Sequence, residues 1–172
     1  MRRLLDADRL RRFMHALGLR APDDGVCYLT GGATAVLVGW REATIDIDLR
    51  LVPEQDVLLR ALPELKEQLE LNVELAYPGD FVPMPPSWEE RSTFVVQEGR
   101  LTFRHVDLYA QALAKLERGH TRDLEDVHAM LSRGLVTPVK LRELFAEIEV
   151  ELYRYPAIDP VSFRAAVERA GR

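Results

Sequence analysis

Hydrophobic and polar residues in the first 105 positions follow patterns that predict a small sheet with helices. Hydrophobic side chains recur at helical spacing over residues 4–17 and 56–71, and both segments are therefore expected to be helices. Strict alternation over residues 43–52 predicts the clearest strand. Shorter elements are expected as strands at 26–29, 72–77, 93–97 and 101–105 and as a helix at 33–38. The last two strands flank a short turn containing glycine, which favours a hairpin.

After residue 105 the pattern is helical. Helices are expected at 107–118, 121–133, 137–152 and 160–169. Residues 78–86 carry four prolines and are expected to form an ordered surface loop. The prediction is an α+β fold: a small mixed-sheet core with helices over residues 1–106, followed by a C-terminal helical region, 107–172, packed on that core.

Composition narrows the class of protein. The chain has 172 residues, of which 47% are hydrophobic and 30% charged, so it is expected to fold. Its single cysteine, Cys27, excludes an internal disulfide and a multi-cysteine zinc site. The net charge of −5 argues against a globally basic nucleic-acid binder. Its apolar runs are too short to span a bilayer, and charged residues interrupt any signal-peptide core, so we expect a cytoplasmic protein without membrane contact.

Two carboxylates are predicted on one strand face. Asp46 and Asp48 are two residues apart, so their Cα atoms would lie roughly 6.6 Å apart with side chains on the same side. Such a pair can bind one or two divalent cations, and all-oxygen donors favour Mg²⁺ or Mn²⁺. The alternative is a half-exposed strand with a solvated polar face.

A diglycine, Gly31-Gly32, precedes this strand at the start of the expected short helix. Paired glycines let a ligand approach the backbone closely, and amides at a helix start can bind phosphate. The alternative is a tight turn with no ligand.

Together these motifs resemble the nucleotidyltransferase superfamily that includes DNA polymerase beta. The resemblance lies in the diglycine of Leu29–Gly32 followed by the Asp-x-Asp of Thr44–Leu49, with Arg41 between them as in bacterial members. A second stretch, Ala114–Asp126, is similar to a helical motif of abortive-infection toxin nucleotidyltransferases. The likeness, which covers residues 25–165, extends to a small bacterial family of nucleotidyltransferases of unknown function.

The resemblance implies transfer of a nucleoside monophosphate from an NTP to an acceptor, with Mg²⁺ or Mn²⁺ as cofactor. The implied metal ligands are Asp46, Asp48 and Glu74. The implied catalytic residues are these three with Lys115 and Asp123. The implied nucleotide-binding residues are Gly31, Gly32, Arg41, Thr44 and Arg118.

Two of these assignments have alternatives. Glu74 lies between hydrophobic residues on a strand that can neighbour the Asp46 strand, as the superfamily's third acid does. Asp107 is the rival third carboxylate, although it also suits the N-cap of the next helix. Lys115, Arg118 and Arg122 have helical spacing and could instead form a solvated basic face with ion pairs along the helix.

The function also has alternatives. A non-catalytic nucleotide-binding module or a toxin–antitoxin-type regulatory module could have the same fold, with a protein partner on its helical half. A plain α+β interaction domain is the third interpretation. The sequence does not identify the NTP or the oligomeric state, and the acceptor could be RNA, a protein or a small molecule.

Overall fold

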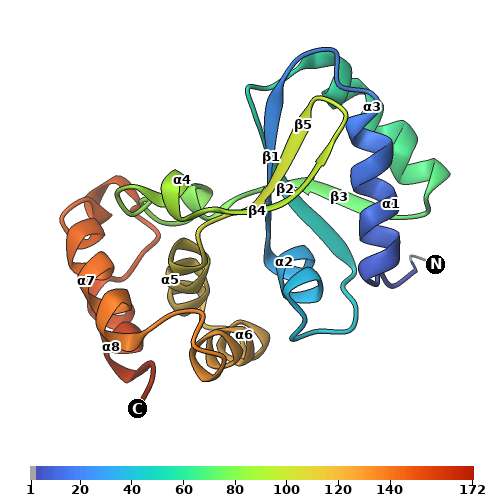
Figure 1. The fold of residues 1–172 in the computed structure, drawn as a ribbon. Coiled ribbons are helices and arrows are strands. Elements are labelled where there is room, and N and C mark those ends of the chain that lie inside the picture. Colours follow the sequence, from blue (N-terminus) through green and yellow to red (C-terminus); the bar gives the residue numbers. More distant parts are fainter. Residues whose placement is uncertain (1–2) are drawn as a thin grey trace. The chain divides into compact units, whose positions relative to one another are not determined.

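The computed structural model describes residues 3–172, so the first two residues of the predicted first region lie outside it. The chain forms two compact units (Figure 1). The first unit comprises residues 3–77 with 93–105, and the second comprises residues 78–92 with 106–172. Each unit has its own hydrophobic core.

The first unit is built on a five-stranded mixed sheet. Its strands are β1 (Gly25–Thr30), β2 (Asp46–Val52), β3 (Asn72–Leu75), β4 (Thr93–Glu98) and β5 (Leu101–His105), in the order β3-β2-β1-β5-β4. Strand β1 pairs antiparallel with β2 and parallel with β5, while β2 and β3 are parallel and β4 and β5 form the hairpin. These strands and the helices after residue 106 confirm the predicted α+β fold.

Three helices cover one face of this sheet. They are α1 (Ala7–Gly18), α2 (Gly31–Val38) and α3 (Asp56–Gln68), and their apolar side chains join those of the strands in one buried cluster. Helices α1 and α3 lie next to each other in that layer (Figure 1). Along β2, buried hydrophobic residues alternate with half-buried polar ones. The opposite face of the sheet is therefore polar.

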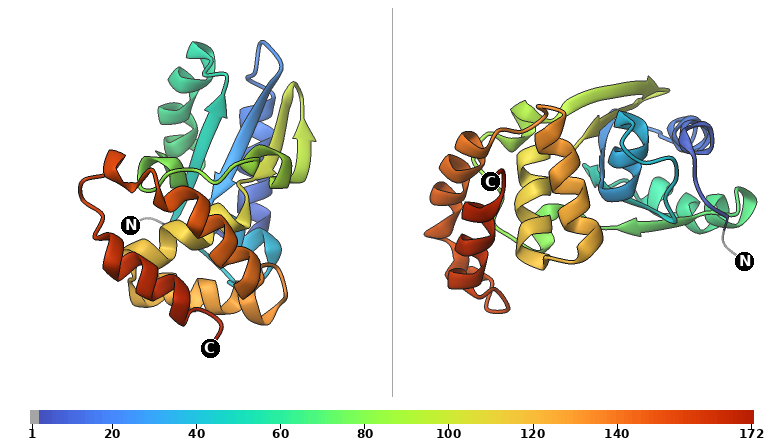
Figure 2. Two further views of the ribbon diagram at one scale, coloured as in Figure 1. Left: turned by 90° about the vertical axis from the view of Figure 1, so that its left-hand side faces the viewer. Right: turned by 90° about the horizontal axis from the view of Figure 1, so that it is seen from below.

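The second unit is helical. It contains α4 (Trp88–Arg91), α5 (Leu108–Arg118), α6 (Thr121–Ser132), α7 (Pro138–Glu149), α8 (Pro160–Arg169) and two short 3-10 turns, η1 (Pro78–Asp80) and η2 (Leu152–Arg154). Helix α5 lies beside α6, and α7 beside α8 (Figure 2). The rings of Phe145 and Phe163 meet edge to face, with centroids 4.9 Å apart, and fix α7 against α8.

Two local differences from the sequence prediction have tertiary causes. The first helix begins at Ala7 rather than at residue 4, because Leu5 forms an isolated antiparallel bridge with Thr44. The expected loop ends in the single turn α4, whose Arg91 donates two hydrogen bonds to Asp107. Neither partner is close in sequence, so local periodicity could not indicate them. Within residues 3–172, no helix has the length and apolarity needed to cross a membrane.

Candidate functional site

The predicted carboxylates lie together on the polar face of the first unit's sheet. The parallel register pairs Asp46 with Asn72 and Asp48 with Glu74, so all four side chains leave the same face. The Asn72 Nδ2 atom donates to Asp46 Oδ1 at 2.6 Å and to Glu74 Oε1 at 3.3 Å. One buried amide therefore links two of the three predicted acids.

The third acid, Asp48, lies against the diglycine turn. Thr30, at the end of β1, is the register partner of Asp48, and Gly31 follows it with a φ of +62°. A Cβ atom on Gly31 would lie 2.7 Å from Asp48 Oδ2. Both the left-handed backbone and the close carboxylate require glycine here.

The second glycine packs against Thr44. A Cβ atom on Gly32 would collide with the Thr44 hydroxyl. That hydroxyl donates to the Asp46 carbonyl oxygen at 3.3 Å, and Thr44 is buried. Thr44 thus connects the start of α2 to the start of β2, and both glycines contact the Asp-x-Asp segment.

Arg41 lies in the connection between α2 and β2. Its side chain is half-buried, and its backbone N–H donates to the Ala35 carbonyl oxygen at 3.2 Å. This hydrogen bond continues the C-terminal end of α2 into the connection. The predicted nucleotide-binding role of Arg41 remains a prediction.

The donor set on this face consists of oxygen atoms and one amide. Asp46 and Asp48 are half-buried and Glu74 is exposed, and the three like charges share one sheet face. Hydrogen bonds from Asn72 to Asp46 and Glu74 stabilise two of these carboxylates. Within residues 3–172, no three His, Cys, Asp or Glu side chains are arranged closely enough to hold a metal ion. The chemistry of the oxygen donors fits a hard cation such as Mg²⁺, and the Asn72 amide hydrogens stand between two of them.

The remaining predicted residues belong to an ion-pair network in the second unit, in which Lys115 and Asp123 are buried and Arg118 is exposed. Lys115 Nζ lies 2.8 Å from Asp126 Oδ2 and 3.7 Å from Asp123 Oδ1. Arg118 donates to both Asp123 oxygens, at 2.8 and 2.6 Å. Lys115, Asp123 and Asp126 are all buried, so the alternative of a solvated basic face is wrong for Lys115. Its burial results from the packing of α6 on α5, which helical spacing alone does not reveal.

The electrostatics of this network keep Asp123 ionised. Burial raises the pKa of Asp123, whereas the hydrogen bond and charge of Arg118, with a contribution from Lys115, lower it by more, and the net direction is downward. Each charged side chain of the network has a partner of opposite sign inside the unit.

Asp107, the rival third carboxylate, is the N-cap of α5. It accepts from the backbone N–H of Tyr109 at 3.1 Å and from Arg91 Nε and Nη2 at 3.1 and 2.8 Å. The N-cap interpretation is thus confirmed, and its buried carboxylate holds α4 to the start of α5.

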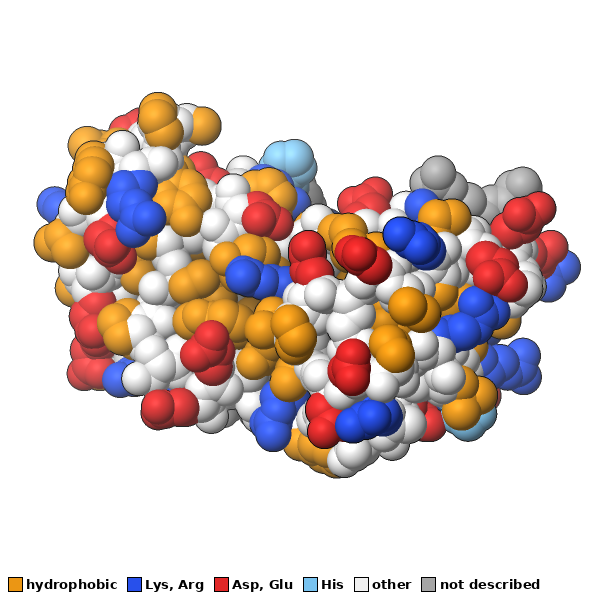
Figure 3. Space-filling view, turned by 90° about the horizontal axis from the view of Figure 1, so that it is seen from above, with side chains coloured by type: hydrophobic (Ala, Val, Ile, Leu, Met, Phe, Trp, Pro, Cys, Tyr) orange, Lys and Arg blue, Asp and Glu red, His pale blue; other side chains and the backbone are white. Residues whose placement is uncertain are grey.

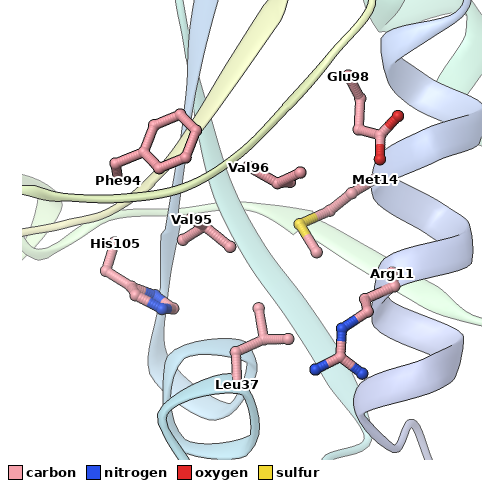
Figure 4. Close-up of a pocket in the computed structure, with 8 residues that line it drawn as sticks. All are labelled: Arg11, Met14, Leu37, Phe94, Val95, Val96, Glu98 and His105. Carbon is pink, nitrogen blue, oxygen red and sulfur yellow. The ribbon is translucent and has the colours of Figure 1, made fainter.

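A separate cavity of about 400 Å³ lies on the helical side of the sheet (Figure 4). Its lining consists of Arg11, Met14, Leu37, Phe94, Val95, Val96, Glu98 and His105, none of them a predicted site residue. His105 points into it, with Nδ1 3.0 Å from the Thr34 hydroxyl, and burial lowers its pKa to about 4. No sequence motif indicated this cavity, because its walls come from four separate elements.

An Asp-x-Asp strand placed against a diglycine helix start, in a mixed five-stranded sheet, is the arrangement of the nucleotidyltransferase class. The family model described as "Nucleotidyltransferase of unknown function (DUF6036)" matches residues 8–163, and the chain belongs to this family. The family implies an NTP as substrate. Searches of curated proteins and of solved structures give no match.

The Gly31→Ala variant tests the contact between the turn and Asp48. Gly134 has a similar φ of +69° and open space around it, so Gly134→Ala is the matched control. Both variants should lose roughly 1–2 kcal/mol of stability, because an alanine is strained in this backbone region. Only Gly31→Ala displaces the Asp48 carboxylate, and it should weaken Mg²⁺·NTP binding about tenfold, measured by calorimetry. Equal NTP affinity of Gly31→Ala and the wild type would contradict this account.

Asn72→Ala tests the amide that links Asp46 and Glu74. Loss of a buried donor to charged groups should lower the free energy of unfolding by roughly 2 kcal/mol. Added Mg²⁺ should restore part of this loss, because it also offsets the repulsion between the acids. Gln68→Ala is the control, because it removes an exposed hydrogen bond of 2.8 Å from Gln68 to Glu64. This variant should lose less stability, and its stability should not respond to Mg²⁺. An unchanged denaturation midpoint for Asn72→Ala would refute the role of this amide.

The buried His105 should make the stability of the protein depend on pH. The pKa of His105 is 6.5 in the unfolded chain and about 4 in the folded chain. Between about pH 4 and pH 6.5 the unfolded state therefore binds a proton at this histidine that the folded state does not bind. Stability should therefore fall as the pH drops from 6.5 to about 4, with a contribution of roughly 3 kcal/mol. His105→Gln should remove this contribution in urea titrations at several pH values, whereas the exposed His128→Gln should keep it. A His105→Gln protein with the full wild-type drop would exclude the assignment.

Proposed function

We propose that the protein is a metal-dependent nucleotidyltransferase that moves a nucleoside monophosphate from an NTP to an acceptor hydroxyl. The observation that carries the proposal is that Asp46, Asp48 and Glu74 leave one polar sheet face, with Asp48 directly against the Gly31-Gly32 turn. Membership of the family implies that the substrate is an NTP. The polar sheet face carries oxygen donors of the kind that a nucleotide-bound cation needs.

The proposed metal ligands are the carboxylates of Asp46, Asp48 and Glu74. Rotation of the terminal amide of Asn72 would turn its oxygen toward them and withdraw the N–H donor that now bonds Asp46. When bound, Mg²⁺ would neutralise phosphate charge and polarise the α-phosphorus. The carboxylates would be held in place by the strand register before any substrate arrives.

The chain's own groups would perform the remaining steps. The diglycine turn, with no side chain on either residue, lets the β- and γ-phosphates approach the backbone at the start of α2. The exposed carboxylate of Glu74 would accept the proton of the acceptor hydroxyl as that oxygen attacks. Thr44 would fix the turn to β2 and so hold the phosphates beside Asp46 and Asp48.

Lys115, Arg118 and Asp123 enter the proposal through the motif that they share with the toxin nucleotidyltransferases. We propose that Lys115 offsets charge that develops on the phosphates and that Asp123 positions it, together with Arg118. In the second unit Lys115 is already bound to Asp126 and Asp123. Any Lys115 variant therefore needs a stability measurement, since its removal leaves buried carboxylates without a partner.

One observation favours a second candidate, a nucleotide-binding module without turnover. The Asn72 amide donates hydrogen bonds to Asp46 and Glu74 at the place where a shared cation would be bound. A protein that retained this arrangement would bind nucleotide through the turn and leave the α-phosphorus unactivated. Nucleotide binding without labelled product would support this candidate over the transferase.

Asp46→Asn and Asp48→Asn test the transferase. The assay contains an NTP labelled at the α-phosphate, Mg²⁺ and a mixture of RNA, proteins and small alcohols as acceptors. Each variant should transfer the label at least about 100-fold more slowly than the wild type. Asp56→Asn, at an exposed position on α3, should keep the wild-type rate and controls for the loss of one charge. The proposal fails if the wild type is inert with all four NTPs, or if Asp46→Asn transfers at the wild-type rate.

A further inference from the structure

The polar sheet face carries two arginines in addition to the acids. Arg50 follows Asp48 by two residues on β2, so its side chain leaves the same face. Tyr28 on β1 is the register partner of Arg50 on one side and of Arg104 on the other. Arg50, Tyr28 and Arg104 therefore form a row across three strands, here called the arginine row, beside the row of Asp48 and Glu74.

This positive charge is local. The whole chain has a net charge of −5, and on the face drawn in Figure 3 acidic and basic side chains are interspersed. Because the chain is acidic overall, an anion would be bound by particular residues rather than by a general attraction. In the arginine row, two arginine side chains leave the same face of the sheet as the proposed catalytic acids.

The Arg50 guanidinium rests on an aromatic ring. Its Cζ lies 3.9 Å from the centre of the Tyr77 ring, which is a cation–π contact. Among residues 3–172, no carboxylate lies within ion-pair distance of Arg50, and the side chain is half-buried. A planar guanidinium that rests on an aromatic ring and lacks a carboxylate is suited to bidentate binding of a phosphate group.

The position of the row along β2 indicates which phosphate it binds. The diglycine turn lies on the Thr44 side of Asp48, and Arg50 lies on the other side, further along the strand. In an in-line displacement, the attacking oxygen and the leaving pyrophosphate are on opposite sides of the phosphorus. If the turn holds the leaving phosphates, the arginine row lies on the side from which the acceptor attacks.

We propose that the arginine row binds a phosphate group of the acceptor, so that the acceptor is a phosphate-bearing alcohol. This inference rests on the proposed function. In this reaction the oxygen of the acceptor hydroxyl forms a bond to the α-phosphorus, and the hydroxyl proton passes to Glu74. The bond between the α-phosphorus and the oxygen that bridges it to the β-phosphorus breaks, and pyrophosphate leaves with the electron pair. A sugar phosphate and the end of a polynucleotide share this chemistry.

The binding experiment uses ribose 5-phosphate and ribose as matched probes of the full chain. Mg²⁺ and a non-hydrolysable NTP analogue fill the nucleotide site first, and binding is followed by NMR chemical shifts. The wild type should bind ribose 5-phosphate about tenfold more tightly than ribose, and Arg50→Gln and Arg104→Gln should each abolish that preference. Arg60→Gln, exposed on α3, is the control and should keep it. Equal binding of the two probes by the wild type, or an unchanged preference in Arg50→Gln, overturns the inference.

The same titrations separate this inference from the proposed function. If the NTP analogue does not bind in the presence of Mg²⁺, or binds equally to Asp46→Asn, the transferase proposal fails, and with it the acceptor role of the row. If the analogue binds in an Asp46-dependent way while Arg50→Gln still prefers ribose 5-phosphate, only the arginine row is refuted.

Kinetics distinguish a substrate contact from a structural role. Arg50→Gln should raise the KM for the acceptor and leave the KM for the NTP unchanged, whereas a merely structural loss would alter both. Arg50→Lys keeps the positive charge but lacks the planar guanidinium that binds phosphate with two hydrogen bonds. Its KM for the acceptor should lie between those of the wild type and Arg50→Gln. Label transfer to ribose 5-phosphate compared with an oligonucleotide that ends in a free hydroxyl shows which source of the phosphate the site accepts. A lower KM for ribose than for ribose 5-phosphate contradicts the proposal.

Discussion

The alternation along β2 is the constraint on which the candidate site depends. Ile47, Leu49 and Leu51 must be buried under the helices, and a strand places successive side chains on opposite faces. Burial of one set therefore fixes Asp46, Asp48 and Arg50 on the other face. A shift of the strand by one residue would put carboxylates in the hydrophobic core, so the same free energy that folds the first unit also orients its polar residues.

The neighbouring strands convert this one-dimensional pattern into a site. Parallel pairing with β3 brings Asn72 and Glu74 beside the two aspartates, and antiparallel pairing with β1 places the diglycine turn, which follows β1, beside Asp48. Glycine at position 31 is then required both by its positive φ and by the Asp48 carboxylate. The turn and the acids are thus parts of a single packing arrangement.

The sequence predicted those features that depend on local pattern. The strands, the main helices, the aspartate pair and the diglycine turn can all be read from a few consecutive residues. The Asn72 bridge, the Arg50–Tyr77 contact and the cavity next to His105 could not be, because they depend on the register between distant segments. The burial of Lys115 likewise depends on where α6 packs, which helical spacing does not specify.

The polar face combines opposite charges in separate rows, and this separation has a chemical consequence. Asp46, Asp48 and Glu74 repel anions unless a cation intervenes, whereas Arg50 attracts them directly. A triphosphate would therefore depend on a divalent cation for its place beside the acids. A phosphate at the arginine row would not. Because both rows belong to one sheet, strand geometry sets their spacing, and in the proposed reaction two anionic reactants would be held side by side without neutralising the whole surface.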